Sequence, residues 1–378
     1  MIDYRQRERN KLKWTRGFLS SFLITLTIVY AFYFIPVPYY IYKPGTAEAI
    51  KPMVRVASGD EEEKGAFMLT TVTMGRSSIF SYLTAKLSPN TEIRKKEEVL
   101  RGSSEKEYST RQEYVMLDSQ SSAIQAAYKQ AGITYKIDSQ GVLVMQTMEG
   151  YPADGILQPG DKIVKVGSKT IVKHEDILNE LKERKAGESI EVTVTRGKTE
   201  KKVAVTLQDL NVVDKEKGRT GTAAGTDTSV PRIGFGISTA ELLEIAPEQG
   251  DKKVTIDAGE IGGPSAGLLF SLEIYNQLTP GDLSKGYRIA GTGTIDAKGT
   301  VCSIGGIRQK IVAADREKAD IFFAPVDRKK GECSLAADVP NASDAADQAG
   351  KIGTKMKVVP VATLDDAVRY LAGLQPKT

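Results

Sequence analysis

The sequence predicts an α+β multidomain protein with a single N-terminal transmembrane helix. Three observations predict this: a charge-free apolar run near the N-terminus, a mixture of strand-like and helix-like segments after it, and a polar stretch that divides the remainder. The chain has 378 residues, enough for two or three domains, and its 40% apolar and 26% charged residues are ordinary for globular proteins.

Composition excludes several classes of function. The formal net charge is only +4, which does not indicate nucleic-acid binding. The two cysteines, Cys302 and Cys333, are too few for a disulfide scaffold or a zinc ribbon, and the sequence leaves open whether they form one disulfide or remain free thiols. Any histidine-dependent triad or metal site would have to use His174, the single histidine. We therefore expect no metal and no cofactor.

The N-terminal run has the properties of a membrane span. Residues 17–35 read GFLSSFLITLTIVYAFYFI, and about 20 apolar residues cross a bilayer core. Six basic residues against two acidic ones precede the run, which predicts a cytoplasmic N-terminus and an extracellular remainder. The alternative is a cleaved signal peptide. However, the run is longer than the usual apolar region of about 7–15 residues, and Pro36–Tyr40 is a poor cleavage site.

The sequence divides into six expected segments. In order, they are a cytoplasmic basic tail (1–16), a transmembrane helix (17–36), a small membrane-proximal α/β region (37–122), a second domain (123–210), a linker (211–230) and a C-terminal α+β domain (231–378). In the membrane-proximal region, extended stretches at Met68–Met74 and Glu113–Leu117 flank a helix at Ser78–Leu87, and the charged run Arg94–Glu107 is expected to be a solvated loop. We find no chemistry there.

The second domain contains strands, turns and a helix in a distinctive order. Residues 141–182 read GVLVMQTMEGYPADGILQPGDKIVKVGSKTIVKHEDILNELK, which resembles a PDZ domain. The resemblance implies that an extended peptide is added to a sheet edge, beside the helix that begins near Glu175. It places the groove at Gly141, Val142, Leu143, Ile177 and Leu181. The alternative is that the helix residues are plain core, and that His174 is a solvated residue at the helix start.

A glycine-rich turn that enters a helix holds the first candidate catalytic residue. Residues 257–267 read DAGEIGGPSAG, and a helical pattern follows, so Ser265 lies at a helix start. Unpaired N–H groups and the positive end of the helix dipole can stabilise an oxyanion at such a place. We expect Gly263 and Ala266 to serve the oxyanion or the substrate backbone. The alternative is that Ser265 is only an N-cap.

A second motif places a lysine on an apolar helix face. Residues 298–314 read KGTVCSIGGIRQKIVAA, which predicts a strand, a Gly-Gly turn and a helix on which Ile307, Lys310 and Ile311 share one face. A buried lysine tends to become neutral, and a neutral amine can accept a proton from a serine hydroxyl. The alternative is that Lys310 reaches water or pairs with a carboxylate such as Asp257 or Glu260.

Together, the two motifs resemble the proteolytic domain of the Lon family. The resemblance covers about residues 231–372 and consists of GPSAG at 263–267, IAGTGTI at 289–295, GxVxxIGGIxxK at 299–310 and FFAP at 322–325. It implies a serine endopeptidase with Ser265 as nucleophile and Lys310 as general base, supported by Thr292. Thr294 stands where ATP-dependent members usually have a glutamate.

The whole arrangement resembles the ATP-independent, extracellular PDZ–Lon proteases of Gram-positive bacteria. The sequence contains no G-x-x-x-x-G-K-[ST] phosphate-binding string. The resemblance implies small secreted peptides or membrane proteins as substrates, such as signalling peptides or cell-division inhibitors, held by their C-terminus in the PDZ groove. The expected partners thus include the bacterial membrane but neither ATP nor nucleic acid, and the oligomeric state stays open.

Two other functions compete with this interpretation. A signal-peptidase-like enzyme also combines a membrane anchor with a serine and a lysine, but the turn around Ser265 and the helix around Lys310 follow the Lon pattern. A PDZ-bearing scaffold with an inactive protease domain would have no reason to keep both Ser265 and Lys310.

Overall fold

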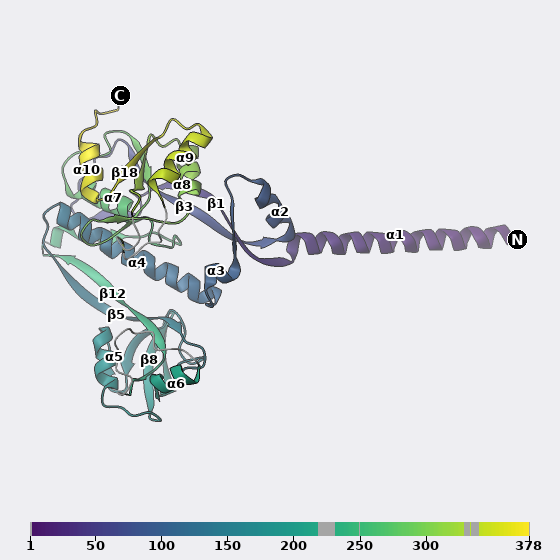
Figure 1. Cartoon of the computed structure of the whole chain (residues 1–378), viewed down its shortest axis with the longest axis horizontal. Coiled ribbons are helices and arrows are strands. Elements are labelled where there is room, and N and C mark those ends of the chain that lie inside the picture. Colours follow the sequence, from purple (N-terminus) through teal and green to yellow (C-terminus); the bar gives the residue numbers. More distant parts are fainter. Residues whose placement is uncertain (1, 218–230, 249, 329–332, 334–339, 378) are drawn as a thin grey trace.

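The structure is a computed structural model that describes residues 2–217, 231–248, 250–328, 333 and 340–377. Helix α1 (Ile2–Phe34) projects away from the rest of the molecule (Figure 1). Its segment Arg16–Phe34 is long and apolar enough to cross a membrane, and none of it is buried. The apolar run is therefore helical as expected, and its place near the N-terminus also fits a signal sequence.

The protein contains a six-stranded mixed sheet built from both ends of the chain. Its strand order is β18-β17-β14-β3-β1-β4. Strands β14, β17 and β18 run parallel to one another and to β3, whereas β1 is antiparallel to β3 and β4. The strand bounds are β1 Pro36–Ala49, β3 Ala66–Ser78, β4 Glu92–Lys95, β14 Arg288–Gly291, β17 Ile321–Pro325 and β18 Lys357–Val361. The stretch expected as a membrane-proximal region thus shares a sheet with the C-terminal segment.

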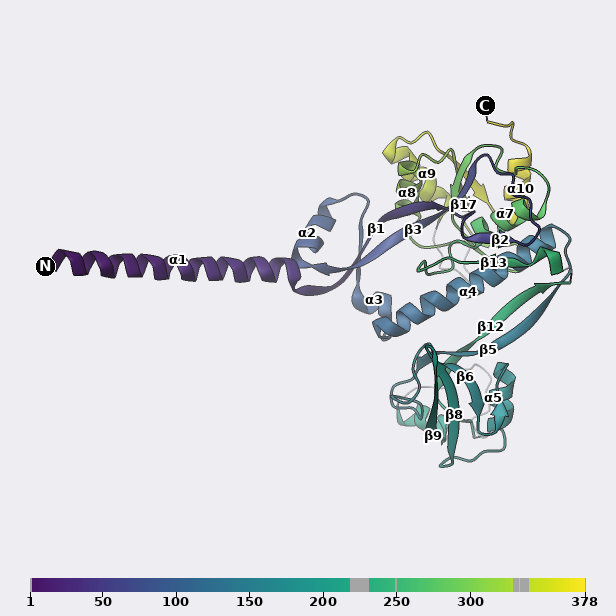
Figure 2. The ribbon, with the colours of Figure 1, turned by 180° about the vertical axis from the view of Figure 1, so that it is seen from behind.

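Helices cover both faces of this sheet. In β3, Phe67 and Leu69 point to one face and Met68 to the other, as the period of two requires. The first face packs under α4, α7 and α10, and the second under α8 and α9. The helix bounds are α4 Glu105–Gln130, α7 Gly267–Leu278, α8 Ile307–Arg316, α9 Ala342–Ile352 and α10 Leu364–Ala372. The result is a three-layer core with α4 along its outside (Figures 1 and 2).

Helix α4 is longer than the sequence pattern indicated. The expected extended stretch Glu113–Leu117 lies inside it. The expected loop Arg94–Glu107 contains the end of β4, the short helix α3 (Lys96–Leu100) and the start of α4. Ser104 and Glu107 form a capping box, in which each side chain accepts a hydrogen bond from the other residue's backbone N–H. This S-x-x-E string is a helix-start signal, and the density of charges around it concealed it.

The PDZ-sized domain has its own sheet and its own core. The sheet order is β12-β5-β6-β8-β9, with β7 beside β6. Its elements are β5 Tyr135–Thr147, β6 Lys162–Val166, β7 Lys169–Thr170, α5 His174–Leu181, β8 Ser189–Arg196, β9 Thr199–Thr206 and β12 Ile237–Pro247. Val142, Ile163 and Val192 are fully buried in this core. The paired strands β5 and β12 form a ribbon that joins the domain to the three-layer core (Figure 2).

The remaining elements are short. The expected linker 211–230 overlaps α6 (Leu210–Glu216), and its residues 218–230 lie outside the described residues. The helix expected at Ser78–Leu87 is present as α2 (Ile79–Leu87), with Ser78 as its N-cap. The other elements are β2 Val54–Val56, β10 Gln208–Asp209, β11 Ile233–Gly234, the 3-10 helix η1 Gly250–Lys252, β13 Val254–Ile256, β15 Thr294–Ile295 and β16 Val301–Cys302.

Candidate active site

The turn before α7 holds Ser265 against helix α4. Gly263 has a φ of +91°, a backbone conformation that residues other than glycine rarely adopt. Its N–H donates to the Gln112 carbonyl at 3.0 Å. The Ser119 hydroxyl donates to the Pro264 carbonyl at 2.9 Å. Two hydrogen bonds with α4, one accepted and one donated by the helix, therefore hold Gly263 and Pro264 and fix the backbone that leads into Ser265.

Helix α8 brings Lys310 to the serine. The Lys310 Nζ lies 2.8 Å from the Ser265 Oγ and donates to the Thr70 carbonyl at 2.7 Å. Lys310 is only 3% exposed, and its helix neighbours Ile307 and Ile311 are buried with it. Burial lowers the pKa of Lys310 to about 7, because the charged ammonium loses its hydration.

The alternative partners of Lys310, Asp257 and Glu260, form no ion pair or hydrogen bond with it. Asp257 and Glu260 are exposed, and no carboxylate among the described residues forms an ion pair with Lys310. The lysine therefore neither extends to water nor gains a counter-charge. A buried amine with a lowered pKa and a serine hydroxyl in hydrogen-bond reach is the arrangement required for activating an oxygen nucleophile.

Thr292 contacts Ser265 rather than Lys310. Its hydroxyl donates to the Ser265 carbonyl at 3.0 Å, and the N–H of Gly293 donates to the same oxygen at 2.9 Å. Thr292 is fully buried at the end of β14. The residue thus anchors the backbone of Ser265, which fixes the position from which the side chain leaves.

The two residues expected to serve an oxyanion differ in their bonding. The N–H of Gly263 is already used by Gln112, so Gly263 can donate to an oxyanion only if that hydrogen bond breaks. The N–H groups of Ser265 and Ala266 have no acceptor among the residues that the structure describes. Both lie at the N-terminal end of α7, where backbone N–H groups and the helix dipole favour negative charge. Ala266 therefore fits the expected role, and Gly263 does not in this conformation.

A cavity of about 640 Å³ opens over the serine and the lysine. One wall comes from the turn at 260–266, and the other comes from β1, β3 and α4, where no sequence motif indicated a function. Residues of that second wall are Tyr42, Glu48, Leu69, Thr70, Thr71, Val72, Tyr108, Gln112 and Met116. The Thr70 carbonyl is the contact that the sequence could not reveal, because a backbone atom acts there and its residue type carries no information.

The peptide groove expected in the PDZ-like domain requires a correction. Val142 and Leu143 of β5 pair with β12 on one side and with β6 on the other, so this strand has no free edge there. Gly141 pairs with β12 as well, and Ile177 and Leu181 are buried core residues. The edge strand next to β5 is β12, which comes from a part of the chain that the sequence assigned to the next domain.

His174 lies against this edge strand. It is exposed at the start of α5, its Nδ1 lies 2.9 Å from the Thr239 Oγ1, and its backbone N–H donates to Glu241 at 2.7 Å. Helix α5 is thus hydrogen-bonded to β12. His174 takes part in no metal cluster, since the described residues contain no group of three or more potential ligands.

The two cysteines form a disulfide. Cys302 and Cys333 are joined, with their Cα atoms 6.0 Å apart. The sequence left this pairing open, because 31 residues separate the two positions and spacing alone does not give a Cα distance.

Comparison with known families identifies two domains. Residues 129–207 match the model of the PDZ domain, and residues 238–371 match the model of the Lon protease (S16) C-terminal proteolytic domain. The second match contains Ser265, Thr292 and Lys310. The chain therefore carries a PDZ domain and a Lon-type proteolytic domain, as the two resemblances implied.

Individual proteins give the same picture. The chain is 35% identical to the Lon protease of Campylobacter jejuni over 108 residues, which are 29% of this chain and 12% of that protein. It is 33% identical over 128 residues to a probable periplasmic serine endoprotease DegP-like of Ectopseudomonas mendocina, covering 33% of this chain and 26% of that protein. The chain thus spans a small part of the length of these relatives.

A solved structure is also similar. The PDZ domain of an SdrC-like protein from Listeria monocytogenes aligns with 26% of this chain and 87% of its own, at 19% identity and a TM-score of 0.21.

Proposed function

We propose that this protein is an ATP-independent serine endopeptidase that uses a Ser265–Lys310 dyad on the outer face of a bacterial membrane. The observation that carries the proposal is the 2.8 Å distance between the Ser265 Oγ and the Lys310 Nζ, with the lysine buried and its pKa lowered to about 7. The Lon-type match over residues 238–371 supports a peptide bond as the bond that is cut.

The geometry supports a two-step mechanism. Neutral Lys310 takes the proton of Ser265 while the Ser265 Oγ attacks the peptide carbonyl, and the resulting oxyanion lies near the N–H groups of Ser265 and Ala266. The Lys310 ammonium then protonates the leaving amine as the C–N bond breaks. A water molecule, deprotonated by the neutral lysine, releases the acyl group from Ser265 and restores the hydroxyl.

The supporting contacts have separate roles in this mechanism. The Thr70 carbonyl accepts a hydrogen bond from the Lys310 Nζ at 2.7 Å, which fixes the amine and leaves its lone pair for the serine proton. The Thr292 hydroxyl and the N–H of Gly293 hold the Ser265 carbonyl, so the oxygen nucleophile keeps its position through both steps. The chain's sequence has no phosphate-binding loop, so no step of the proposal uses ATP.

Three features support anchoring at the outer face of a membrane. The apolar part of α1 is unburied, with basic residues before it. Helix α2 presents Ile79, Leu83 and Leu87 at spacings of four, so they share one face, and all three are exposed. The Phe80 ring stacks on Tyr33 of α1, with the ring centroids 4.5 Å apart, which continues the apolar surface of α1 onto α2. The disulfide between Cys302 and Cys333 fits an oxidising compartment.

The PDZ domain supports a peptide or a small protein as the substrate. In the proposal, the substrate's extended C-terminus adds to the free edge of β12 beside α5, rather than to β5. Such a substrate needs no unfolding motor, because short secreted peptides, including signalling peptides, and flexible segments of membrane proteins, such as cell-division inhibitors, are already extended.

The dyad is tested with the full chain in detergent, using unfolded casein and a peptide library without ATP. Ser265→Ala and Lys310→Ala should each lower kcat by at least about 10³-fold, and Lys310→Arg should not restore activity, because an arginine stays protonated. Lys351→Ala, which changes an exposed lysine on α9, is the matched control and should cleave normally. Equal cleavage by all of these proteins would remove the dyad from the mechanism.

A further inference from the structure

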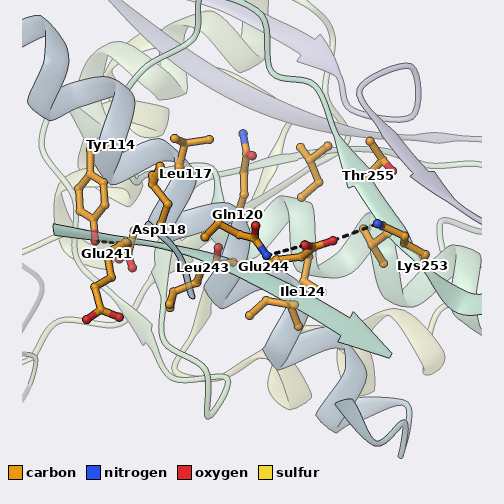
Figure 3. A pocket seen from close by; sticks show the side chains of 16 residues that line it. Tyr114, Leu117, Asp118, Gln120, Ile124, Glu241, Leu243, Glu244, Lys253 and Thr255 are labelled. Carbon is orange, nitrogen blue, oxygen red and sulfur yellow. Dashed lines mark hydrogen bonds and ion pairs between the residues drawn. The ribbon is translucent and has the colours of Figure 1, made fainter. Parts of the chain in front are cut away.

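A second cavity lies away from the catalytic pair, between α4, β12 and β13. Its volume is about 490 Å³. Figure 3 shows that side chains from three elements line it, among them Leu117, Asp118 and Ile124 of α4, Leu243 of β12 and Thr255 of β13. The lining is thus partly apolar, and it combines one residue set from the three-layer core with another from the ribbon that carries the PDZ domain.

A third hollow lies between this cavity and the cavity over Ser265 and Lys310. A hollow of about 620 Å³ shares Leu117, Gln120 and Ile256 with the remote cavity. At its other end, the same hollow shares Met116, Glu260 and Ile261 with the cavity over Ser265 and Lys310. The three hollows therefore follow one another along residues 254–266, and neighbouring hollows share residues of α4; we refer to this row of hollows as the groove.

The floor of this groove has an edge that suits an extended peptide. Strand β13 pairs with β2, with Thr255 opposite Arg55, and pairs with no other strand among the described residues. All three residues of β13 line the remote cavity, so the strand borders that space. An extended backbone can add to such an edge by main-chain hydrogen bonds. A compact small molecule would use neither the edge nor the length of the groove.

The charges around the remote cavity are unbalanced. Its lining includes three carboxylates, Asp118, Glu241 and Glu244, against Lys253 alone. Glu244 is satisfied by Lys253 at 3.0 Å and by the Gln140 amide at 2.8 Å. Glu241 accepts hydrogen bonds from the His174 N–H and the Ser139 hydroxyl.

Asp118 is the exception. No cation or hydrogen-bond donor pairs with it among the residues that the structure describes, and Tyr114 and the Glu241 carboxylate lie on the same side of the cavity. Partial burial raises the pKa of Asp118, because its charged form is poorly hydrated there. A cationic group in the cavity would supply the missing counter-charge.

We propose that the cavity between α4, β12 and β13 is a remote subsite for the substrate, in which the peptide lies extended along β13 and places a lysine or arginine side chain against Asp118. This inference rests on the proposed peptidase function and adds a substrate preference to it. The preferred substrate is an extended peptide that carries a basic residue several positions from the cleaved bond.

The test uses the full chain in detergent and matched fluorogenic peptides. One series carries a single lysine that is moved along the peptide on both sides of the cleaved bond, and its partner series carries norleucine at the same positions. At one register, the wild-type protein should cleave the lysine peptide with a kcat/KM on the order of ten-fold higher. Asp118→Asn should abolish this preference, and Asp118→Glu should largely restore it. Asp347→Asn, at an exposed position of α9, should leave it unchanged.

Two further measurements distinguish the loss of a subsite from a general loss of activity. Short peptides that fill only the cavity over Ser265 should be cleaved equally by the wild type and by Asp118→Asn, which also shows that the variant is folded. Asp118→Lys should invert the preference toward a glutamate peptide. A lysine preference that is absent, or that persists in Asp118→Asn, overturns the subsite while leaving the peptidase intact. Cleavage of all peptides by Ser265→Ala would instead overturn the proposed function itself.

Discussion

At the level of a single residue, the burial of Lys310 has opposite effects on the stability of the fold and on the proposed reaction. It is buried without a counter-charge, which disfavours its ammonium form, and it contacts the one hydroxyl that the proposed reaction must deprotonate. The same burial that weakens the folded state therefore prepares the base. This is a local instance of the trade-off between stability and activity that functional sites commonly show.

The pH dependence of the reaction follows from this burial. Because the pKa of Lys310 is lowered to about 7, kcat/KM should rise about ten-fold per pH unit below that value and become flat above it. An ordinary lysine would move the rise to far higher pH. The measurement is a pH–rate profile with a neutral peptide substrate, on which no substrate group titrates. A profile that is flat between pH 5 and 8 would argue against Lys310 as the base.

The stability of the protein should depend on the same group. The pKa of Lys310 is about 7 in the folded state against 10.5 for an ordinary lysine, so the unfolded chain binds more protons between these values. Stability should therefore rise with pH across this window, and the unfavourable contribution should be complete below about pH 7. Lys310→Met should raise the unfolding free energy by roughly 1–3 kcal/mol while abolishing activity, as measured by denaturant unfolding at pH 6. Lys351→Met, on the surface, should change stability little.

At the scale of elements, local patterns predicted which segments form strands and helices better than they predicted their partners. The helix expected at Ser78–Leu87 occurs as α2, and the helix that follows Ser265 and the helix that carries Lys310 begin near their expected positions. Phe67 pairs with Ile289, which lies more than 200 residues away in the sequence. The alternation of apolar and polar side chains predicts a strand but not its partner, so this pairing could not be predicted from it. The contact between Ser265 and Lys310 could be predicted from the sequence only because both motifs resemble one family.

The PDZ groove shows the same limit. Strand β12 lies far along the chain from β5, and the sequence placed it in the C-terminal domain, so the edge strand of the PDZ sheet could not be identified from local pattern. The alternation of residues within a strand is the same whichever strand it pairs with, so the pattern of β12 does not indicate that its partner is β5. Only the register of Glu241 opposite Val142 revealed which strand covers β5.

This correction predicts where a bound peptide protects backbone amides. On adding a C-terminal peptide that the Ser265→Ala protein binds but does not cut, hydrogen exchange should slow at residues 237–241 of β12, because a new strand accepts its outward N–H groups. Strand β9, the opposite edge of the same sheet, is the internal control and should exchange as before. Protection confined to β9, or absent from β12, would contradict the revised groove.

At the scale of the whole molecule, the position of α2 predicts how the protein meets a bilayer. The face of α2 that carries Ile79, Leu83 and Leu87 continues the apolar surface of α1, so it should enter the interfacial region when α1 spans the membrane. In proteoliposomes of the full chain, a nitroxide on Leu83→Cys should become accessible to oxygen and protected from a water-soluble nickel chelate.

The same label on Lys351→Cys provides the control for this experiment. Helix α9 lies on the globular part, away from α1 (Figure 1), and its label should remain accessible to the nickel chelate. The native cysteines are joined to each other, so the introduced thiol is the intended site of labelling. Equal accessibility at both positions would mean that α2 does not touch lipid.

The ribbon of β5 and β12 determines where the PDZ domain can be removed from the chain or replaced by another domain. The chain enters the PDZ domain and leaves it at neighbouring positions. Tyr135 pairs with Pro247, and the N–H of Glu248 donates to the Thr134 carbonyl at 3.0 Å. A segment whose two ends lie one strand spacing apart can be inserted or removed without stretching its host. The segment to delete or to exchange for another domain is therefore 135–247. A deletion that ends before β12 would remove β5 and leave β12 without its partner strand.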